Sequence, residues 1–230
     1  MKNFRKLIFE TAHCYLPQLL YKKTSYSQDG EDMMLQTYYE GKRDYKGFYV
    51  DIGAHHPYRF SNTAFFYNKG WRGINVEPAP SLFSSFKKYR KRDINLNVGV
   101  SDSNSSNHFY VFNDQALNTF DEKIAEERHS NNDRYKIVSK IEIKTYTLED
   151  ILEKYLPNNQ HIDFLTIDVE GLDLNVLKSN NWNKFHPDFI LVECNATIDN
   201  IFEDNIYQFL KEKNYNMEGK TFRTSLFRKK

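Results

Sequence analysis

Acidic side chains recur at the ends of short apolar segments in this 230-residue sequence. The acids that close or follow these segments are Asp51, Glu77, Asp102, Asp168 and Glu193. If the segments are parallel strands, their carboxyl ends share one edge of a sheet, and ligands bind at that edge in open α/β folds. A row of carboxylates there suits a ligand with hydroxyl groups and positive charge, and it disfavours exposed phosphates.

The turn after Asp51 argues further against a pyrophosphate ligand. Residues 52–57 read Ile-Gly-Ala-His-His-Pro, whereas a dinucleotide fingerprint uses three glycines to bring backbone N–H groups to the pyrophosphate. Only Gly53 is present, Pro57 has no N–H, and no Gly-Lys-Ser/Thr sequence follows an apolar segment. NAD, FAD and ATP are therefore disfavoured, and a nucleotide-sugar or NAD-binding Rossmann protein is kept as an alternative.

Glu77 stands 24 residues after Gly53, at the end of the second apolar segment. An acid at this place in a Rossmann-like unit accepts hydrogen bonds from ribose hydroxyls. A ribose-binding acid without a pyrophosphate loop indicates a nucleoside-like cofactor that lacks phosphates. S-adenosyl-L-methionine fits, because it joins ribose and adenine to a sulfonium cation and an amino-acid tail.

Short apolar runs alternate with helix-length segments, which predicts a mostly parallel sheet with helices on both faces. The predicted strands are 48–52, 73–77, 94–100, 164–168 and 189–193. The predicted helices are 61–69, 81–90, 148–155, 172–178 and 204–213. The economical architecture is a doubly wound, Rossmann-like α/β domain, closed by an antiparallel C-terminal pair over 215–217 and 222–227.

Two segments depart from the alternation. Residues 101–146 hold a polar loop, a strand-like run, a charged helical piece and a second alternating run, which we interpret as a β-rich insertion with a substrate-facing lid. Residues 1–25 form an N-terminal helical extension, interpreted as a helix that caps the domain, with peripheral membrane contact as the alternative. Residues 26–230 then form a single domain.

Composition removes several classes of protein. The chain is 40% hydrophobic and 27% charged with a net charge of +1, which indicates a globular domain without an overall field for nucleic acid. The basic run over 87–92 is interpreted as the solvated end of a helix. Cys14 and Cys194 are too few for a disulfide scaffold or a four-cysteine zinc site, and reduced, partly buried thiols fit a cytoplasmic protein. No apolar run is long enough to span a membrane.

Six segments, in order along the chain, resemble the FkbM family of methyltransferases. They are 27–32 (SQDGED), 49–55 (YVDIGAH), 73–78 (GINVEP), 98–102 (VGVSD), 146–152 (YTLEDIL) and 165–171 (LTIDVEG). The resemblance implies a class I methyltransferase fold that uses S-adenosyl-L-methionine. It also implies O-methylation, often of a sugar hydroxyl in a glycan, polysaccharide or nucleotide-linked sugar. A small natural product or a nitrogen acceptor is the alternative, and the number of subunits is left open.

The resemblance also implies roles for individual residues. The implied cofactor-binding residues are Asp29, Asp32, Asp51, Gly53, Ala54, Glu77, Pro78, Ser101, Asp102 and Asp168. Asp29 and Asp32, which lie in the 27–32 segment, would close over the cofactor. Glu77 is the implied ribose acid. Asp168 and Glu170 match an Asp-x-Glu-Gly motif that borders the site of methyl transfer.

Methyl transfer to oxygen requires alignment of the reactants and removal of the hydroxyl proton. Asp168 and Glu170 are the first candidates for the base, and His55 is the next because imidazole titrates near neutrality. The structural alternatives are a helix cap for Asp168 and a backbone hydrogen bond for His55. Oxygen ligands for Mg²⁺ are present, but their spacing is not compact, so no metal ligand is predicted. Aromatic residues over 58–67 are expected in the core, with sugar stacking as the alternative for some.

Overall fold

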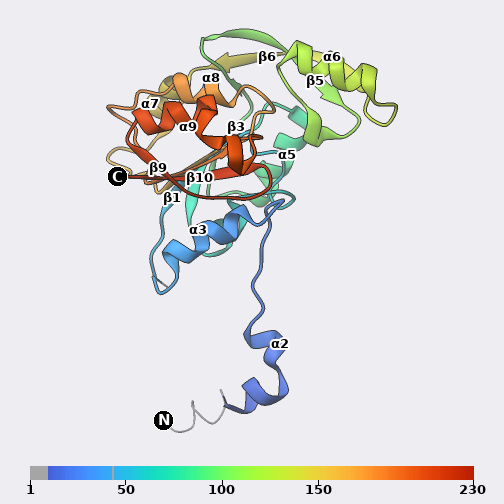
Figure 1. Ribbon diagram of the computed structural model, residues 1–230. Helices are drawn as coiled ribbons and strands as arrows, with labels where there is room; N and C mark the ends of the chain where they lie inside the picture. The colour runs from blue at the N-terminus through green and yellow to red at the C-terminus, as the bar shows by residue number, and fades with distance from the viewer. Residues whose placement is uncertain (1–9, 43) are drawn as a thin grey trace.

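The structure is a computed structural model that describes residues 10–42 and 44–230, and a seven-stranded sheet forms its centre (Figure 1). The strands are β1 (Phe48–Ile52), β2 (Arg72–Val76), β3 (Ile94–Leu96), β7 (Phe164–Ile167), β8 (Phe189–Glu193), β9 (Tyr215–Lys220) and β10 (Thr224–Lys229). Their order is β3-β2-β1-β7-β8-β10-β9; the first five run parallel, and β10 is antiparallel to both neighbours. The predicted Rossmann-like α/β fold with an antiparallel C-terminal strand is confirmed.

Helices cover both faces of this sheet because its strands alternate between two apolar surfaces. The helices are α3 (Glu31–Tyr39), α4 (Ala64–Asn68), α5 (Pro80–Tyr89), α7 (Leu148–Tyr155), α8 (Asp173–Lys178) and α9 (Asn205–Glu212). Tyr49 of β1 packs in one cluster with Leu35 of α3 and Phe66 of α4. Val50 packs in the other cluster, which includes apolar residues of α7, α8 and α9. All five β1 residues are buried, as a central strand of a doubly covered sheet requires.

The prediction of one strand over 94–100 is wrong, because the segment divides into two strands in two sheets. β3 ends at Leu96, and β4 (Gly99–Val100) joins a three-stranded sheet of order β4-β6-β5. Asn97 causes the break: its side-chain amide donates to the carbonyl oxygens of Glu77 and Pro78, both at 2.8 Å. These bonds turn the chain away from β2 after Leu96.

The insertion has the elements that the sequence predicts. They are β5 (Ser105–Phe112), the short 3₁₀ helix η1 (Gln115–Leu117), α6 (Glu122–Asn131) and β6 (Ile137–Tyr146). Tyr110, Phe112 and Ala125 form a small core of their own between β5 and α6. Figure 1 shows this unit projecting from the sheet domain.

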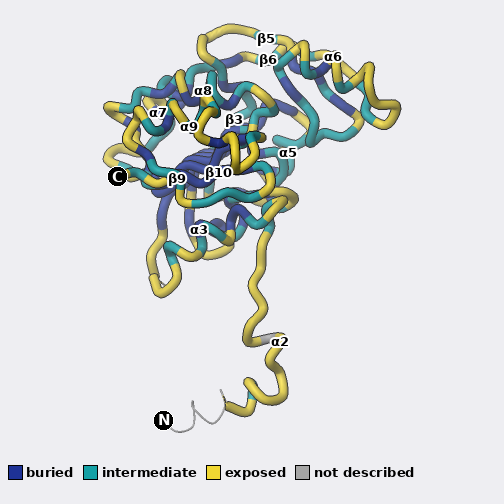
Figure 2. The backbone as a smooth tube through the Cα atoms, in the orientation of Figure 1, coloured by how far each residue is buried: buried dark blue, intermediate teal, exposed yellow. Residues whose placement is uncertain are grey.

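The N-terminal extension differs from its prediction. Helix α2 (Pro17–Leu20) stands away from the domain in Figure 1, and Figure 2 shows the segment as exposed. Tyr15, Leu16 and Tyr21 are all exposed. A helix that caps the domain is therefore the wrong interpretation for these residues, and positions 1–9 of that prediction lie outside the described residues.

The two cysteines differ in their exposure. Cys14 is exposed, contrary to the predicted partial burial, whereas Cys194 is buried. Among the described residues, no helix is both long and apolar enough to cross a membrane.

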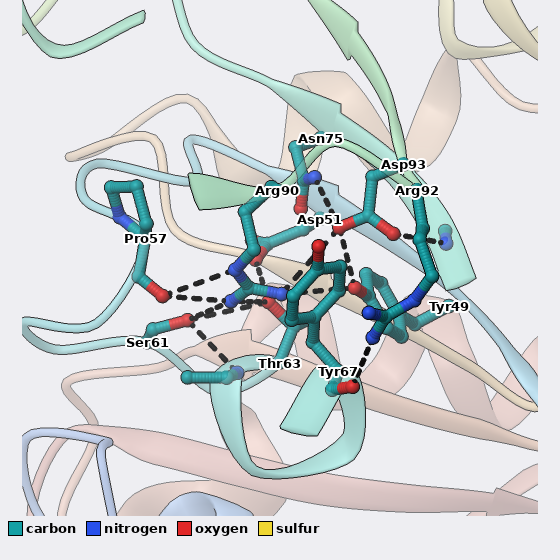
Figure 3. Close-up of polar contacts among 12 residues, drawn as sticks. Tyr49, Asp51, Pro57, Ser61, Thr63, Tyr67, Asn75, Arg90, Arg92 and Asp93 are labelled. Carbon is teal, nitrogen blue, oxygen red and sulfur yellow. Dashed lines mark hydrogen bonds and ion pairs between the residues drawn. The ribbon is translucent and has the colours of Figure 1, made fainter. Parts of the chain in front are cut away.

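The basic run over 87–92 is only partly solvated, because Arg90 is completely buried (Figure 3). Its guanidinium donates to the carbonyl oxygen of Pro57 from Nε at 3.1 Å and from Nη2 at 2.9 Å. It also donates to Tyr49 Oη at 2.9 Å, and it lies 3.5 Å from Asp93 Oδ2. The prediction fails here because the charge pattern of a short run does not show which cation faces inward.

Arg90 also holds the start of the 61–64 turn. Its Nη2 donates to Ser61 Oγ at 3.0 Å and to Thr63 Oγ1 at 3.1 Å. Thr63 Oγ1 in turn donates to Asp51 Oδ2 at 2.8 Å. One buried cation thus connects the end of α5, the turn after β1 and the acid of β1.

We expect Arg90→Met to lower the free energy of unfolding by about 3–5 kcal/mol, because it removes the cation beside the buried Asp93 carboxylate and leaves several buried oxygen acceptors without this donor. Urea denaturation followed by circular dichroism measures the change. Arg72→Met at the exposed first residue of β2 is the matched control and should lose less than about 0.5 kcal/mol. Equal losses in the two variants would contradict the structural role of Arg90.

Candidate functional site

A cavity of about 500 Å³ lies at the carboxyl ends of β1, β2 and β7. β7 lies directly beside β1, on the side opposite β2. The order in which successive strands are added to the sheet therefore reverses between β1 and β7. Open α/β sheets bind their ligands at such a switch point, and the volume lies within the range of small-molecule sites. Residues 114–118 and α6 of the insertion line the cavity on the other side.

Most of the predicted site residues line this cavity. They are Asp51, Gly53, Ala54, His55, Glu77, Pro78, Asp168 and Glu170, and the strand-end acid Glu193 lines it too. Asp29, Asp32, Ser101 and Asp102 are not among its lining residues. The structure therefore brings together four of the five strand-end acids and leaves Asp102 outside.

Local contacts explain the residues that lie elsewhere. The break at Asn97 places Asp102 after β4, where it is exposed and accepts hydrogen bonds from Ser101 and Ser103. Asp32 is buried and accepts hydrogen bonds from Ser25 Oγ, Tyr26 N and Ser27 Oγ, so it holds the 25–27 turn. Asp29 pairs with Arg223, which does line the cavity, at 2.8 Å.

Gly53 sits where the ends of β1 and β7 come closest. Its φ is +80°, and a Cβ atom there would lie 1.8 Å from the carbonyl oxygen of Asp168. The N–H groups of Gly53 and Ala54 both donate to Val76 O at 3.0 Å. Glycine at this position is thus required by backbone conformation and by space together.

Glu77 is buried at the end of β2, and its carboxylate binds the turn beside it. Oε2 accepts the N–H of His55 at 2.8 Å, and Oε1 accepts the N–H of Ala79 at 2.7 Å. Burial raises the pKa of Glu77 to about 8, although both N–H donors oppose the increase. Each carboxylate oxygen keeps one further acceptor position for a ligand.

Asp168 lies at the end of β7, where it is exposed to the cavity and has protein atoms around its other sides. Its side chain accepts no hydrogen bond from the described residues. Burial raises the pKa of Asp168 well above the usual value, and the nearby charges of Glu193, Glu170 and Asp173 raise it further. Burial also raises the pKa of Asp51 to about 6, against the hydrogen bond from Thr63. A cluster of carboxyl groups at one cavity favours a cationic ligand.

Glu170, in contrast, is tied to the insertion. Its Oε2 pairs with Arg128 Nη2 of α6 at 2.5 Å, and its carbonyl oxygen accepts from Thr119 Oγ1 at 3.0 Å. Its φ is +54°, an uncommon conformation for a side chain other than glycine. Burial and Glu193 raise the pKa of Glu170, and Arg128 opposes them. These two contacts attach the insertion to the turn that follows Asp168.

His55 occupies a second left-handed position, with φ of +51°. Burial, followed by the charges of Arg59 and His56, lowers its pKa to about 4. Its Nε2 lies 3.3 Å from Arg59 Nη1, and its ring stacks near-parallel to Phe60 with centroids 6.1 Å apart. His55 is therefore neutral at neutral pH and can accept the hydrogen bond from Arg59.

Several residues that line the cavity were not predicted from the sequence. They are the arginines Arg59, Arg128 and Arg223 and the amides Gln28, Asn62, Gln115, Asn118 and Asn195. Asn62 shows how they are placed: its Nδ2 donates to Thr166 Oγ1 of β7 at 2.9 Å. Of the aromatic run over 58–67, Phe66 and Tyr67 are core residues, and Phe60 is exposed at the cavity. These residues lie in turns and in the insertion, where residue spacing carries no signal of cavity contact.

A family model described as "Methyltransferase FkbM domain" matches residues 51–217. A methyltransferase FkbM from Methylobacillus flagellatus KT is similar in structure, with a TM-score of 0.49 and 12% identity over 80% of this chain and 43% of that chain. This chain thus spans less than half the length of that protein.

A second similar structure comes from Pyrococcus horikoshii and is assigned provisionally as an RNA methyltransferase. Its TM-score is 0.44 and its identity 11%, with 91% of each chain covered. The comparison with curated proteins found no match.

We expect Gly53→Ala to destabilise the protein by at least about 2 kcal/mol more than Gly41→Ala. Both glycines have a positive φ, but a Cβ at Gly41 meets nothing within 4 Å, whereas at Gly53 it collides with the Asp168 carbonyl. The pair therefore separates steric conflict from backbone strain. Chemical denaturation of both variants measures the difference, and equal stabilities would show that the two strand ends do not approach this closely.

Proposed function

This chain belongs to the FkbM methyltransferase family, and from that premise we propose that it uses S-adenosylmethionine to methylate a hydroxyl group of a saccharide. Methyl transfer is the activity of the family, and the cofactor and the acceptor are the proposal. The observation that carries it is the placement of Glu77 and Asp168 around one cavity, at the ends of β2 and β7 on either side of β1.

The donor set of the cavity fits a nucleoside cation better than a nucleotide. Glu77 is placed to accept hydrogen bonds from ribose hydroxyls, as acids at the end of the second Rossmann strand do. Asp51, Asp168 and Glu193 supply negative charge toward the same space. The N–H groups of Gly53 and Ala54 are already taken by Val76 O, so the turn offers little to a pyrophosphate. These features support S-adenosylmethionine over NAD.

Residues of this chain must remove the hydroxyl proton and position the reacting groups. When bound, S-adenosylmethionine supplies an electrophilic methyl group on its sulfonium. Asp168 is the best placed of the three candidate bases to take the hydroxyl proton, because its carboxylate lines the cavity and accepts no hydrogen bond from residues 10–42 and 44–230. Glu170 is held by Arg128, and His55 contacts Arg59. We therefore assign Asp168 as the base, Glu170 as a positioning residue for the lid, and His55 as a positioning residue for Arg59.

The cavity lining supports a saccharide acceptor. Five amide side chains border the space, and each carries both a donor and an acceptor for hydroxyl groups. They come from separate parts of the chain, namely the 27–32 segment, the turn before α4, the insertion and the end of β8. A polyhydroxylated ring satisfies such a convergent set, whereas an apolar natural product leaves it unpaired.

Calorimetric titration with S-adenosylhomocysteine, with NADH in parallel, tests the cofactor. Micromolar binding of S-adenosylhomocysteine without binding of NADH is the expected result. Binding of NADH alone, or of neither compound, would overturn the proposed cofactor. A panel of mono- and oligosaccharides with radiolabelled S-adenosylmethionine then tests the acceptor, and label found only in small natural products or amines would refute a sugar acceptor.

We expect Glu77→Ala to weaken S-adenosylhomocysteine binding by about 1–3 kcal/mol, through the lost hydrogen bonds to ribose. Calorimetry measures the affinity, and thermal melting establishes that the variant is folded. Glu153→Ala removes an acid whose partner is Lys184, outside this cavity, and should leave the affinity unchanged. An unchanged affinity in Glu77→Ala would remove Glu77 from the cofactor site.

We expect Asp168→Asn to lower kcat by about 10²–10⁴-fold with little change in S-adenosylhomocysteine affinity. In the wild-type protein, kcat/KM should rise with pH, because the raised pKa of Asp168 keeps the base protonated at lower pH. This pH dependence should disappear in the variant. A parallel loss of affinity and turnover would make Asp168 a binding residue instead.

A further inference from the structure

The turn after β1 has almost no free backbone donors. The N–H groups of Gly53 and Ala54 donate to Val76 O, and that of His55 donates to Glu77 Oε2. Further along, the N–H groups of Tyr58 and Arg59 both donate to His56 Nδ1, at 3.1 and 3.0 Å. Pro57 has no N–H to offer. An anionic group that approaches this turn must therefore be held by a side chain.

The proposed cofactor carries such an anion. Its amino-acid tail has a carboxylate as well as an ammonium group, and the sulfonium adds a second positive charge. The acidic residues at the strand ends suit the two cations and repel the carboxylate. The lining of the cavity must therefore include a cation that is not already neutralised.

Of the three arginines that line the cavity, two already have carboxylate partners. Arg128 pairs with Glu170 at 2.5 Å, and Arg223 pairs with Asp29 at 2.8 Å. Arg59 has no carboxylate partner among the described residues. The one hydrogen-bonding contact of its side chain in the described structure is His55 Nε2 at 3.3 Å, and a neutral imidazole leaves the guanidinium charge intact.

Arg59 is nevertheless held in place. Its guanidinium carbon lies 4.2 Å from the centre of the Phe60 ring, in a cation–π arrangement. Phe60 has φ of +57° and is exposed at the cavity. A bulky residue in this conformation is an outlier that persists where the surrounding structure imposes it. Asn62, two residues on, anchors the turn to Thr166 of β7, on the strand that ends at Asp168.

We propose that Arg59, stacked on Phe60 and hydrogen-bonded to His55, is the binding site for the carboxylate of the cofactor's amino-acid tail. This inference rests on the proposed use of S-adenosylmethionine. The planar guanidinium keeps most of its N–H donors for a bidentate pair with a carboxylate. The side chain thereby replaces the backbone donors that this turn uses internally.

Calorimetry with two ligands tests the assignment. S-adenosylhomocysteine has the amino-acid tail, and 5′-methylthioadenosine keeps the adenosine and the thioether but lacks the tail. We expect Arg59→Ala to weaken S-adenosylhomocysteine binding by about 10- to 100-fold, with 5′-methylthioadenosine binding changed by less than about threefold. Arg59→Lys should lie between, because it keeps the charge without the fork.

Arg223→Ala is the electrostatic control, since it removes the same charge from a residue of the cavity whose partner is Asp29. A loss for S-adenosylhomocysteine as large in Arg223→Ala as in Arg59→Ala would overturn the specific role of Arg59. An unchanged affinity in Arg59→Ala, or an equal loss for both ligands, would overturn it too. If wild-type protein binds neither ligand, the proposed cofactor itself fails, and that result differs from every other outcome.

Discussion

The buried guanidinium of Arg90 is the interaction on which the rest of this site depends. It is completely buried, and it joins the end of α5 to the turn that follows β1. Through Thr63 it also reaches Asp51, the acid of the central strand. A cation in this position is costly to desolvate, so its acceptors must stay in place around it. The turn between residues 53 and 63, which carries His55, Arg59 and Asn62, is thus attached to a rigid point beneath the cavity.

The carboxylates around the cavity have different roles because they have different partners. Glu77 binds backbone N–H groups and holds the turn after β1; Asp173 does the same for the turn after β7, accepting from Val169 and Gly171. Glu170 binds Arg128 of the insertion. Of these four, only Asp168 has no hydrogen-bond partner among the described residues, and burial and the neighbouring acids raise its pKa. The structural acids therefore contribute to the electrostatic environment of Asp168, the acid that we propose for the reacting groups.

The sequence predicted the sheet and the floor of the cavity well, and for a physical reason. Strand ends in a parallel sheet must converge, so Asp51, Glu77 and Asp168 met as expected. The failures arose where one side chain decided the geometry. Asn97 turned the chain and carried Asp102 to the surface, and Arg90 turned inward from a run of exposed cations. Neither event changes hydrophobic periodicity, so no pattern in the sequence reports it.

The roof of the cavity, formed by the insertion, is built differently from its floor, formed by the strand ends. The floor is built from strand ends, and three of the six segments that resemble the family, 49–55, 73–78 and 165–171, lie there. The roof comes from the insertion, which is anchored to the floor by Thr119 and Arg128 on the turn at Glu170, and by Ile124 against Gly171, where a Cβ would lie 2.3 Å from its Cδ1. In the proposed function, the contacts to the cofactor lie on the strand ends and on the turn that holds Arg59. We therefore propose that the roof selects the acceptor, because the insertion has a small core of its own and can change its side chains while the sheet stays the same.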